Sequence, residues 1–76
     1  MKPKFKQGDS VRIKDIISRE EIRGRWGFVV SNAIDMNGSY VYWIFVPEAP
    51  YKTNVTEPNI KDLSWSMMEY VLELLE

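Results

Sequence analysis

With 76 residues, 45% of them hydrophobic, the chain is long enough for one folded domain, and we expect that domain to span residues 1–76. The chain contains neither cysteine nor histidine, which excludes disulfides, thiolate chemistry and the usual ligands of zinc. A net charge of −1 conceals an asymmetry, because residues 1–25 carry eight Lys or Arg against four acids, whereas residues 26–76 carry two against seven.

Two short segments in the first half of the chain have the patterns of β-strands. Apolar and polar side chains alternate over residues 10–14, which is typical of a strand with one buried face. A second strand is predicted over residues 26–32, and Gly27 within it marks a bend or a close approach between backbones. Residues 15–25, which lie between the two strands, are expected to form a long charged loop with one helical turn.

The middle of the chain carries the clearest turn signal, Asn37-Gly38, because this pair favours the positive φ angles of a type I′ hairpin turn. The strand predicted after it, over residues 39–46, is apolar or aromatic at nearly every position. We therefore expect both of its faces to be covered, or one of them to meet a partner. Three prolines then exclude a central strand from residues 47–59, since proline cannot donate to a sheet.

The C-terminal segment has two interpretations. Apolar residues recur at helical spacing over residues 61–75, which predicts a helix, although the acidic residues near its end oppose the helix dipole. In the alternative, residues 63–66 form a strand, residues 67–70 a tight turn and residues 71–75 a closing strand. Local periodicity slightly favours the helix, and both interpretations stay open at this point.

Four segments share their patterns with a known group of small barrels. They are Gly8-Asp9-Ser10-Val11-Arg12-Ile13, the run from Gly24 to Val30, the run from Tyr40 to Val46, and the run from Met68 to Leu75. In this order they resemble the strands of an SH3-like barrel. The layout is similar to small SH3-like accessory subunits of photosystem I, of ferredoxin-thioredoxin reductase and of the photosynthetic NDH complex, and to KOW-type modules.

This resemblance implies a fold and a class of role. The fold is mainly β: an SH3-like antiparallel barrel of about five strands, with a short helix or helical turn near the C-terminus. The accessory subunits dock on larger proteins or help to receive ferredoxin, whereas KOW-type modules contact nucleic acid or ribosomal and transcription proteins. Fold alone does not decide between these roles.

Basic side chains and a tryptophan gather around the predicted 15–25 loop. They are Arg19, Arg23, Arg25 and Trp26, with Arg12 and Lys14 on the neighbouring strand. Such a set suits phosphate contact combined with base stacking, or an acidic protein surface approached by electrostatic steering. The plainer alternative is a solvated loop with Trp26 as a core anchor. The acidic overall balance argues against nucleic acid.

A second group of side chains is aromatic and consists of Tyr40, Tyr42, Trp43, Tyr51 and Trp65. On an alternating strand, Tyr40 and Tyr42 share one face and Trp43 lies on the other. One of these faces should fill the core. The other face, if the C-terminal segment leaves it uncovered, would be an apolar patch of the kind found at interfaces.

The sequence shows no pattern typical of a catalytic site, a membrane span or a signal peptide. Glu20 and Glu21 are neighbours that face different directions, and the chain has no phosphate-binding glycine loop. No apolar run reaches the length of a membrane span, and the basic N-terminus leads into no segment of signal-peptide type. We therefore expect no enzyme, no cofactor and no metal site, and a cytoplasmic location.

These observations predict a non-enzymatic accessory or regulatory module that docks on a larger protein or complex. The expected contact uses the 15–26 loop and the outer face of the 39–46 strand, and the favoured residues are Arg19, Arg23, Arg25, Trp26, Tyr42 and Trp43. The alternative is a KOW-like nucleic-acid-binding module that uses the same loop. A homodimer joined through an exposed strand edge is a third hypothesis.

Overall fold

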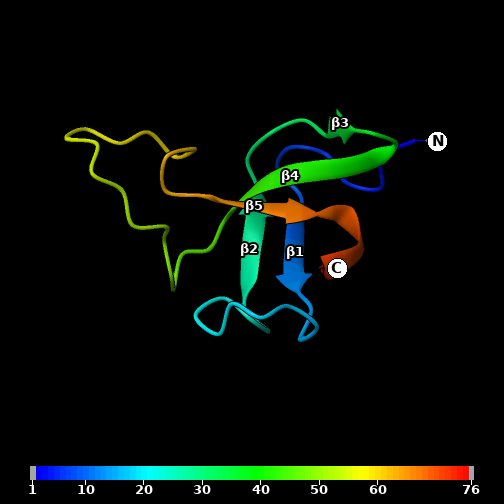
Figure 1. Ribbon diagram of the computed structural model, residues 1–76, viewed down its shortest axis with the longest axis horizontal. Coiled ribbons are helices and arrows are strands. Elements are labelled where there is room, and N and C mark those ends of the chain that lie inside the picture. Colours follow the sequence, from blue (N-terminus) through cyan, green and yellow to red (C-terminus); the bar gives the residue numbers. More distant parts are fainter. Residues whose placement is uncertain (1, 76) are drawn as a thin grey trace.

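The computed structural model describes residues 2–75 and consists mainly of antiparallel β-structure (Figure 1). Its elements are β1 (Ser10–Ile13), β2 (Trp26–Val29), β3 (Ile34–Met36), β4 (Ser39–Phe45), β5 (Trp65–Met68), the single 3₁₀ turn η1 (Glu69–Val71) and β6 (Leu72–Leu74). The predicted mainly β fold with a helical turn near the C-terminus is thus confirmed, with six strands in place of about five.

Strand β4 is the centre of the sheet. The strand order is β3-β4-β2-β1-β6, and β5 pairs with the other edge of β4. The predicted 26–32 strand ends earlier, as β2 at Val29, and pairs with the end of β4, while β3, for which no strand was predicted, pairs with the beginning of β4. In Figure 1, β4 and β5 run across the direction of β1 and β2. No pairing joins β5 to β6 within residues 2–75, so the expected closure into a barrel is corrected to an open, strongly bent sheet.

Two glycines fix the backbone where the sheet turns. At the β3–β4 hairpin, Asn37 and Gly38 have φ angles of 56° and 87°, the positive values that a type I′ turn requires. At Gly27 a Cβ atom would lie 2.6 Å from the carbonyl oxygen of Phe45, so only glycine allows β2 and β4 to approach this closely. Both features agree with the turn and the close approach predicted from the sequence.

The C-terminal segment follows the strand–turn–strand interpretation and not the helical one. β5 pairs with β4 from Trp65 to Met68, and β6 pairs with β1, placing Leu72 opposite Ile13. These pairings give the backbone its hydrogen bonds through distant strands, and side chains alternate between buried and exposed along β5. Among residues 2–75 there is no helix of the length and apolar character needed to cross a membrane.

The core lies on the inner face of the bent sheet. It consists of Phe5, Val11, Ile13, Ile22, Val29, Tyr42, Ile44, Val46, Trp65, Met67, Val71 and Leu72. Tyr42 is completely buried, so its predicted place on an outer contact face is wrong. The reason is the pleat of β4, which turns Tyr42 and Ile44 inward and leaves Trp43 between them on the outer face. Phe5 anchors the N-terminal segment by packing edge-on against Tyr42.

Candidate functional site

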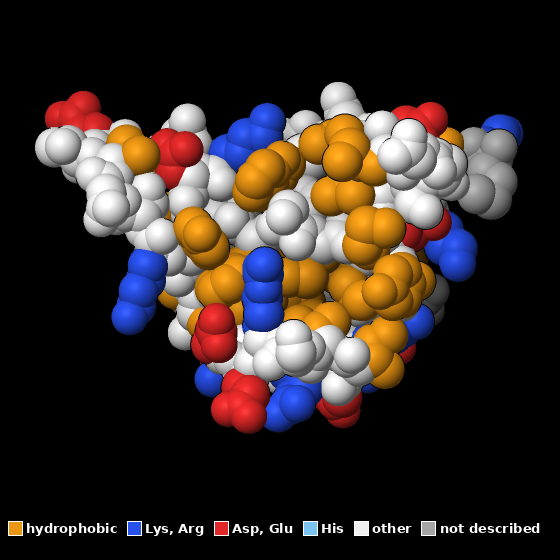
Figure 2. Space-filling model, in the orientation of Figure 1, with side chains coloured by type: hydrophobic (Ala, Val, Ile, Leu, Met, Phe, Trp, Pro, Cys, Tyr) orange, Lys and Arg blue, Asp and Glu red, His pale blue; other side chains and the backbone are white. Residues whose placement is uncertain are grey.

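Three neighbouring cavities form a groove, which we call the aromatic groove. It lies between loop 14–25, loop 46–64 and strand β5. The first cavity has a volume of about 400 Å³ and is lined by Trp43, Tyr51 and Trp65. The second, of about 780 Å³, extends past Pro50, and the third, of about 180 Å³, extends toward η1. Figure 2 shows apolar side chains gathered in the middle of the molecule, with a basic side chain lying among them and further charged groups toward the edges.

Trp65 forms the rigid wall of the aromatic groove. Its indole N–H donates to the carbonyl oxygen of Ala49 at 2.8 Å, which fixes the orientation of the ring. The rings of Tyr51 and Trp65 pack edge to face, with their centroids 4.9 Å apart and their planes at 89°. The backbone N–H of Tyr51 donates to the carbonyl oxygen of Leu63 at 2.8 Å. Loop 46–64 is therefore held against the start of β5 at the place where the two aromatic rings meet.

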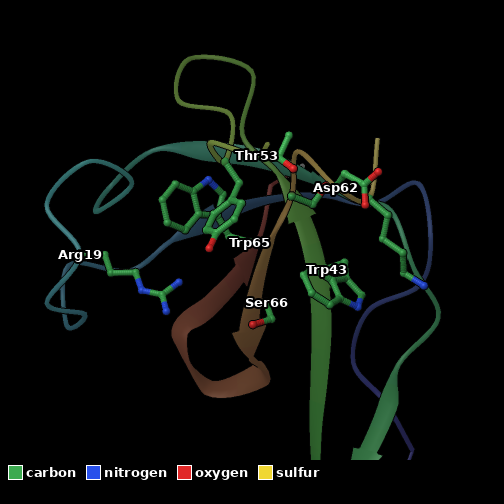
Figure 3. Close-up of a pocket in the computed structure, with 9 residues that line it drawn as sticks. Arg19, Trp43, Thr53, Asp62, Trp65 and Ser66 are labelled. Carbon is green, nitrogen blue, oxygen red and sulfur yellow. The ribbon is translucent and has the colours of Figure 1, made fainter. Parts of the chain in front are cut away.

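Arg19 reaches the aromatic groove from loop 14–25. Its guanidinium carbon lies 5.4 Å from the centroid of the Trp65 ring, a cation–π contact. In Figure 3 the Arg19 side chain extends toward Trp65, while Trp43 lies on the opposite side of the cavity and Ser66 between the two tryptophans. Arg19 is the residue that lines all three cavities, so any chain lying along the groove passes its guanidinium.

Residues 59–64 make the far wall of the first cavity. Asp62 Oδ2 accepts from the N–H of Asn59 at 3.1 Å, and Asn59 Oδ1 accepts from the N–H of Asp62 at 2.9 Å. The hydroxyl of Ser64 donates to the carbonyl oxygen of Ile60 at 2.6 Å. These bonds close a compact turn that presents Lys61 and Asp62 to the cavity.

The six residues predicted from the sequence divide between different parts of the molecule. Arg19 and Trp43 meet in the aromatic groove, whereas Arg23, Arg25 and Trp26 line none of its three cavities. Trp26 is 39% exposed on β2 and packs edge-on against Phe28, with ring centroids 5.0 Å apart. Trp26, Arg23 and Arg25 therefore lie outside the aromatic groove.

Two residues of the groove were missing from the predicted site, Tyr51 and Trp65. Both were recognised as part of the aromatic group, but nothing in the local pattern indicated that they would meet Arg19. One signal was available for Tyr51, which follows Pro50 in a segment where strand formation is excluded. An aromatic side chain in such a loop has no sheet face to fill, and 45% of this one is exposed.

Outside the groove, the Tyr42 hydroxyl and the Glu69 carboxylate form a network of hydrogen bonds with the N-terminal segment. The Tyr42 hydroxyl donates to Glu69 Oε2 at 2.5 Å and accepts from the N–H of Phe5 at 3.3 Å. The N–H of Lys4 donates to the same carboxylate oxygen at 3.0 Å. Burial, with a further contribution from the Glu69 carboxylate, raises the pKa of Tyr42 to about 12. This arrangement ties the N-terminal segment to β4 and η1.

Comparison of the chain with protein-family models, with curated proteins and with solved structures finds no match. The arguments about function therefore rest on the geometry of the aromatic groove and on its charges.

Proposed function

We propose that this protein is a non-enzymatic interaction module, with an SH3-like fold, that docks on a larger protein by binding an extended segment of it in the aromatic groove. The observation that carries the proposal is the set Trp43, Tyr51 and Trp65 around one cavity of about 400 Å³. Of these rings, Tyr51 is exposed, Trp43 is half-buried and Trp65 is buried. Aromatic rings held in fixed orientations are the usual anchors of protein interfaces, because they bury a large area at little cost in side-chain entropy.

The alternative, a nucleic-acid-binding module, is less consistent with the charges of loop 14–25. Arg23 lies 3.9 Å from a carboxylate oxygen of Glu20, and Arg25 lies 3.6 Å from one of Glu48. Nucleic-acid binding depends on several cations that are free to replace the counterions of the phosphates. Two of the four cations of the loop are therefore paired with carboxylates, which lowers the positive charge available to phosphates.

The test is selection from a displayed library of random peptides. The molecule measures 38 × 24 × 22 Å along its principal axes. An extended chain covers about 3.3 Å per residue, so peptides of about ten residues can cross the face. The variant Tyr51→Ala removes the exposed ring of the Tyr51–Trp65 pair. We expect peptides selected on the native protein to lose most of their affinity for this variant.

Phe28→Ala is the matched control, because Phe28 is the partner of Trp26 in an edge-to-face pair of almost the same geometry outside the groove. This variant should bind the selected peptides as the native protein does. Selection of no peptide, or equal loss of affinity in both variants, would contradict the proposal. Single-stranded oligonucleotides that bind in place of the peptides, with steep salt dependence, would favour the nucleic-acid alternative.

A further inference from the structure

Arg19 differs from the other three arginines in its charge partners. Arg12 is paired with Glu73 and Asp15, Arg23 with Glu20, and Arg25 with Glu48. Within residues 2–75, Arg19 takes part in no ion pair, and its recorded side-chain contact is the Trp65 ring. Arg19 lines all three cavities of the groove, and it is the arginine that has no carboxylate partner in the described part of the chain.

The manner in which Arg19 is held leaves its hydrogen-bonding groups available. Among residues 2–75, the Arg19 side chain makes no hydrogen bond and no ion pair, so its planar group keeps its N–H donors for a ligand. These donors match the two oxygens of a carboxylate, with which arginine forms paired, charge-assisted hydrogen bonds. Arg19 thus lies beside the Trp65 ring with donors that can recognise an acidic group.

The remaining charges of the groove point the same way. Lys61 lies on the far wall of the first cavity, and Lys52 lines the second. Against these stand Glu21 and Asp62, and one carboxylate oxygen of Asp62 already accepts a hydrogen bond from Asn59. The charged side chains that line the groove therefore sum to a small positive charge, and the other lining side chains are aromatic, apolar or hydroxyl-bearing.

We infer that the occupant of the aromatic groove is an acidic peptide segment, with an Asp or Glu placed at Arg19 and an apolar or aromatic side chain beside it. The carboxylate receives the in-plane N–H donors of Arg19. The neighbouring apolar side chain fills the hollow past Ala49, Pro50 and Tyr51, the largest of the three cavities. This inference rests on the proposed function, since it specifies the chemistry of the segment that the groove binds.

Peptides are selected from the random library on the native protein. Their affinity for the native protein is then compared with their affinity for variants of the loop. Arg19→Gln removes the charge in the groove, and Arg23→Gln removes a charge of the same loop outside it. Both side chains are exposed, so each variant should keep the fold, which a thermal unfolding curve verifies. We expect the selected peptides to be enriched in Asp and Glu, and their binding to the native protein to weaken with added salt.

For Arg19→Gln we expect the dissociation constant to rise about tenfold, because one hydrogen-bonded charge contact is lost. For Arg23→Gln we expect the dissociation constant to change less than about twofold. Arg19→Lys should fall between the native protein and Arg19→Gln, because it keeps the charge and loses the planar fork. Peptides that require Tyr51 but show no acidic enrichment and no response to Arg19→Gln would overturn the inference and leave the proposed function standing. If no peptide requires Tyr51, both are overturned.

Discussion

Replacement of Tyr42 by Phe tests the polar arrangement that ties the N-terminal segment to the sheet. The change keeps the buried ring and removes the hydroxyl, which donates to Glu69 Oε2 at 2.5 Å and accepts from the N–H of Phe5 at 3.3 Å. A hydrogen bond to a charged group contributes about 1.5–3 kcal/mol to stability, so we expect the free energy of unfolding to fall by that amount. For a domain of this size, a loss of about 2 kcal/mol lowers Tm by roughly 8–16 °C.

The pH dependence gives an independent measure of the same contact. The pKa of Tyr42 is raised from 10.0 to about 12 in the folded protein. Between these values the unfolded chain loses the phenolic proton and the folded protein keeps it, so the stabilisation is complete below pH 10 and is lost as the pH rises toward 12. Two pKa units correspond to a contribution of roughly 3 kcal/mol to the free energy of unfolding. The Tyr42→Phe variant has no such proton and should not lose this contribution.

Urea unfolding followed by tryptophan fluorescence, at pH 8 and at intervals up to pH 12, measures both effects. The difference in unfolding free energy between the native protein and Tyr42→Phe should be greatest at pH 8 and shrink above pH 10. Tyr70→Phe is the control, since the Tyr70 side chain is 65% exposed, and it should unfold as the native protein does. Equal stability of Tyr42→Phe and the native protein at pH 8, or a difference that stays constant up to pH 12, would refute the reasoning.

Three further substitutions test the packing of the sheet, each by thermal and urea unfolding. Gly27→Ala places a methyl group 2.6 Å from the Phe45 carbonyl oxygen and should cost about 1–3 kcal/mol, and an unchanged Tm would show that the strands separate freely. Phe5→Ala removes a buried ring packed on Tyr42 and should lower the free energy of unfolding by about 3–5 kcal/mol. An unchanged free energy would show that the N-terminal segment contributes nothing to the core. Trp43→Ala removes a half-buried ring and should cost less than the roughly 3–5 kcal/mol of a core aromatic, while a full loss would identify it as core.

Much of the architecture could be predicted because its signals are local. The alternation in β1, the Asn37-Gly38 turn and the close approach at Gly27 each depend on a few adjacent residues and their backbone preferences. Loop 14–25 was only partly predictable. It contains three isoleucines, of which Ile22 is buried whereas Ile16 is 64% exposed. The spacing of apolar residues in a loop does not say which of them reaches the core.

The candidate site was less predictable because its members are far apart in the sequence. Arg19 and Trp43 were expected in one contact region, and the structure brings both to the aromatic groove. The other wall comes from Tyr51 and Trp65, which loop 46–64 brings together through the Trp65–Ala49 hydrogen bond and the contact of the two rings. Only the pairing of β4 with β5 determines that this wall faces Trp43.

The sequence by itself determined a small, mainly antiparallel β domain, since period-two hydrophobicity, a hairpin turn and strand-excluding prolines are written in neighbouring residues. Only the tertiary structure decided which face of β4 is inside, that the C-terminal segment is two strands and not a helix, and that the sheet stays open. The physical reason is that β4 and β1 supply the partners of the C-terminal strands, and an ambiguous local periodicity yields to hydrogen bonds and burial offered by distant strands. The aromatic groove, assembled from four distant segments, follows from the same pairings.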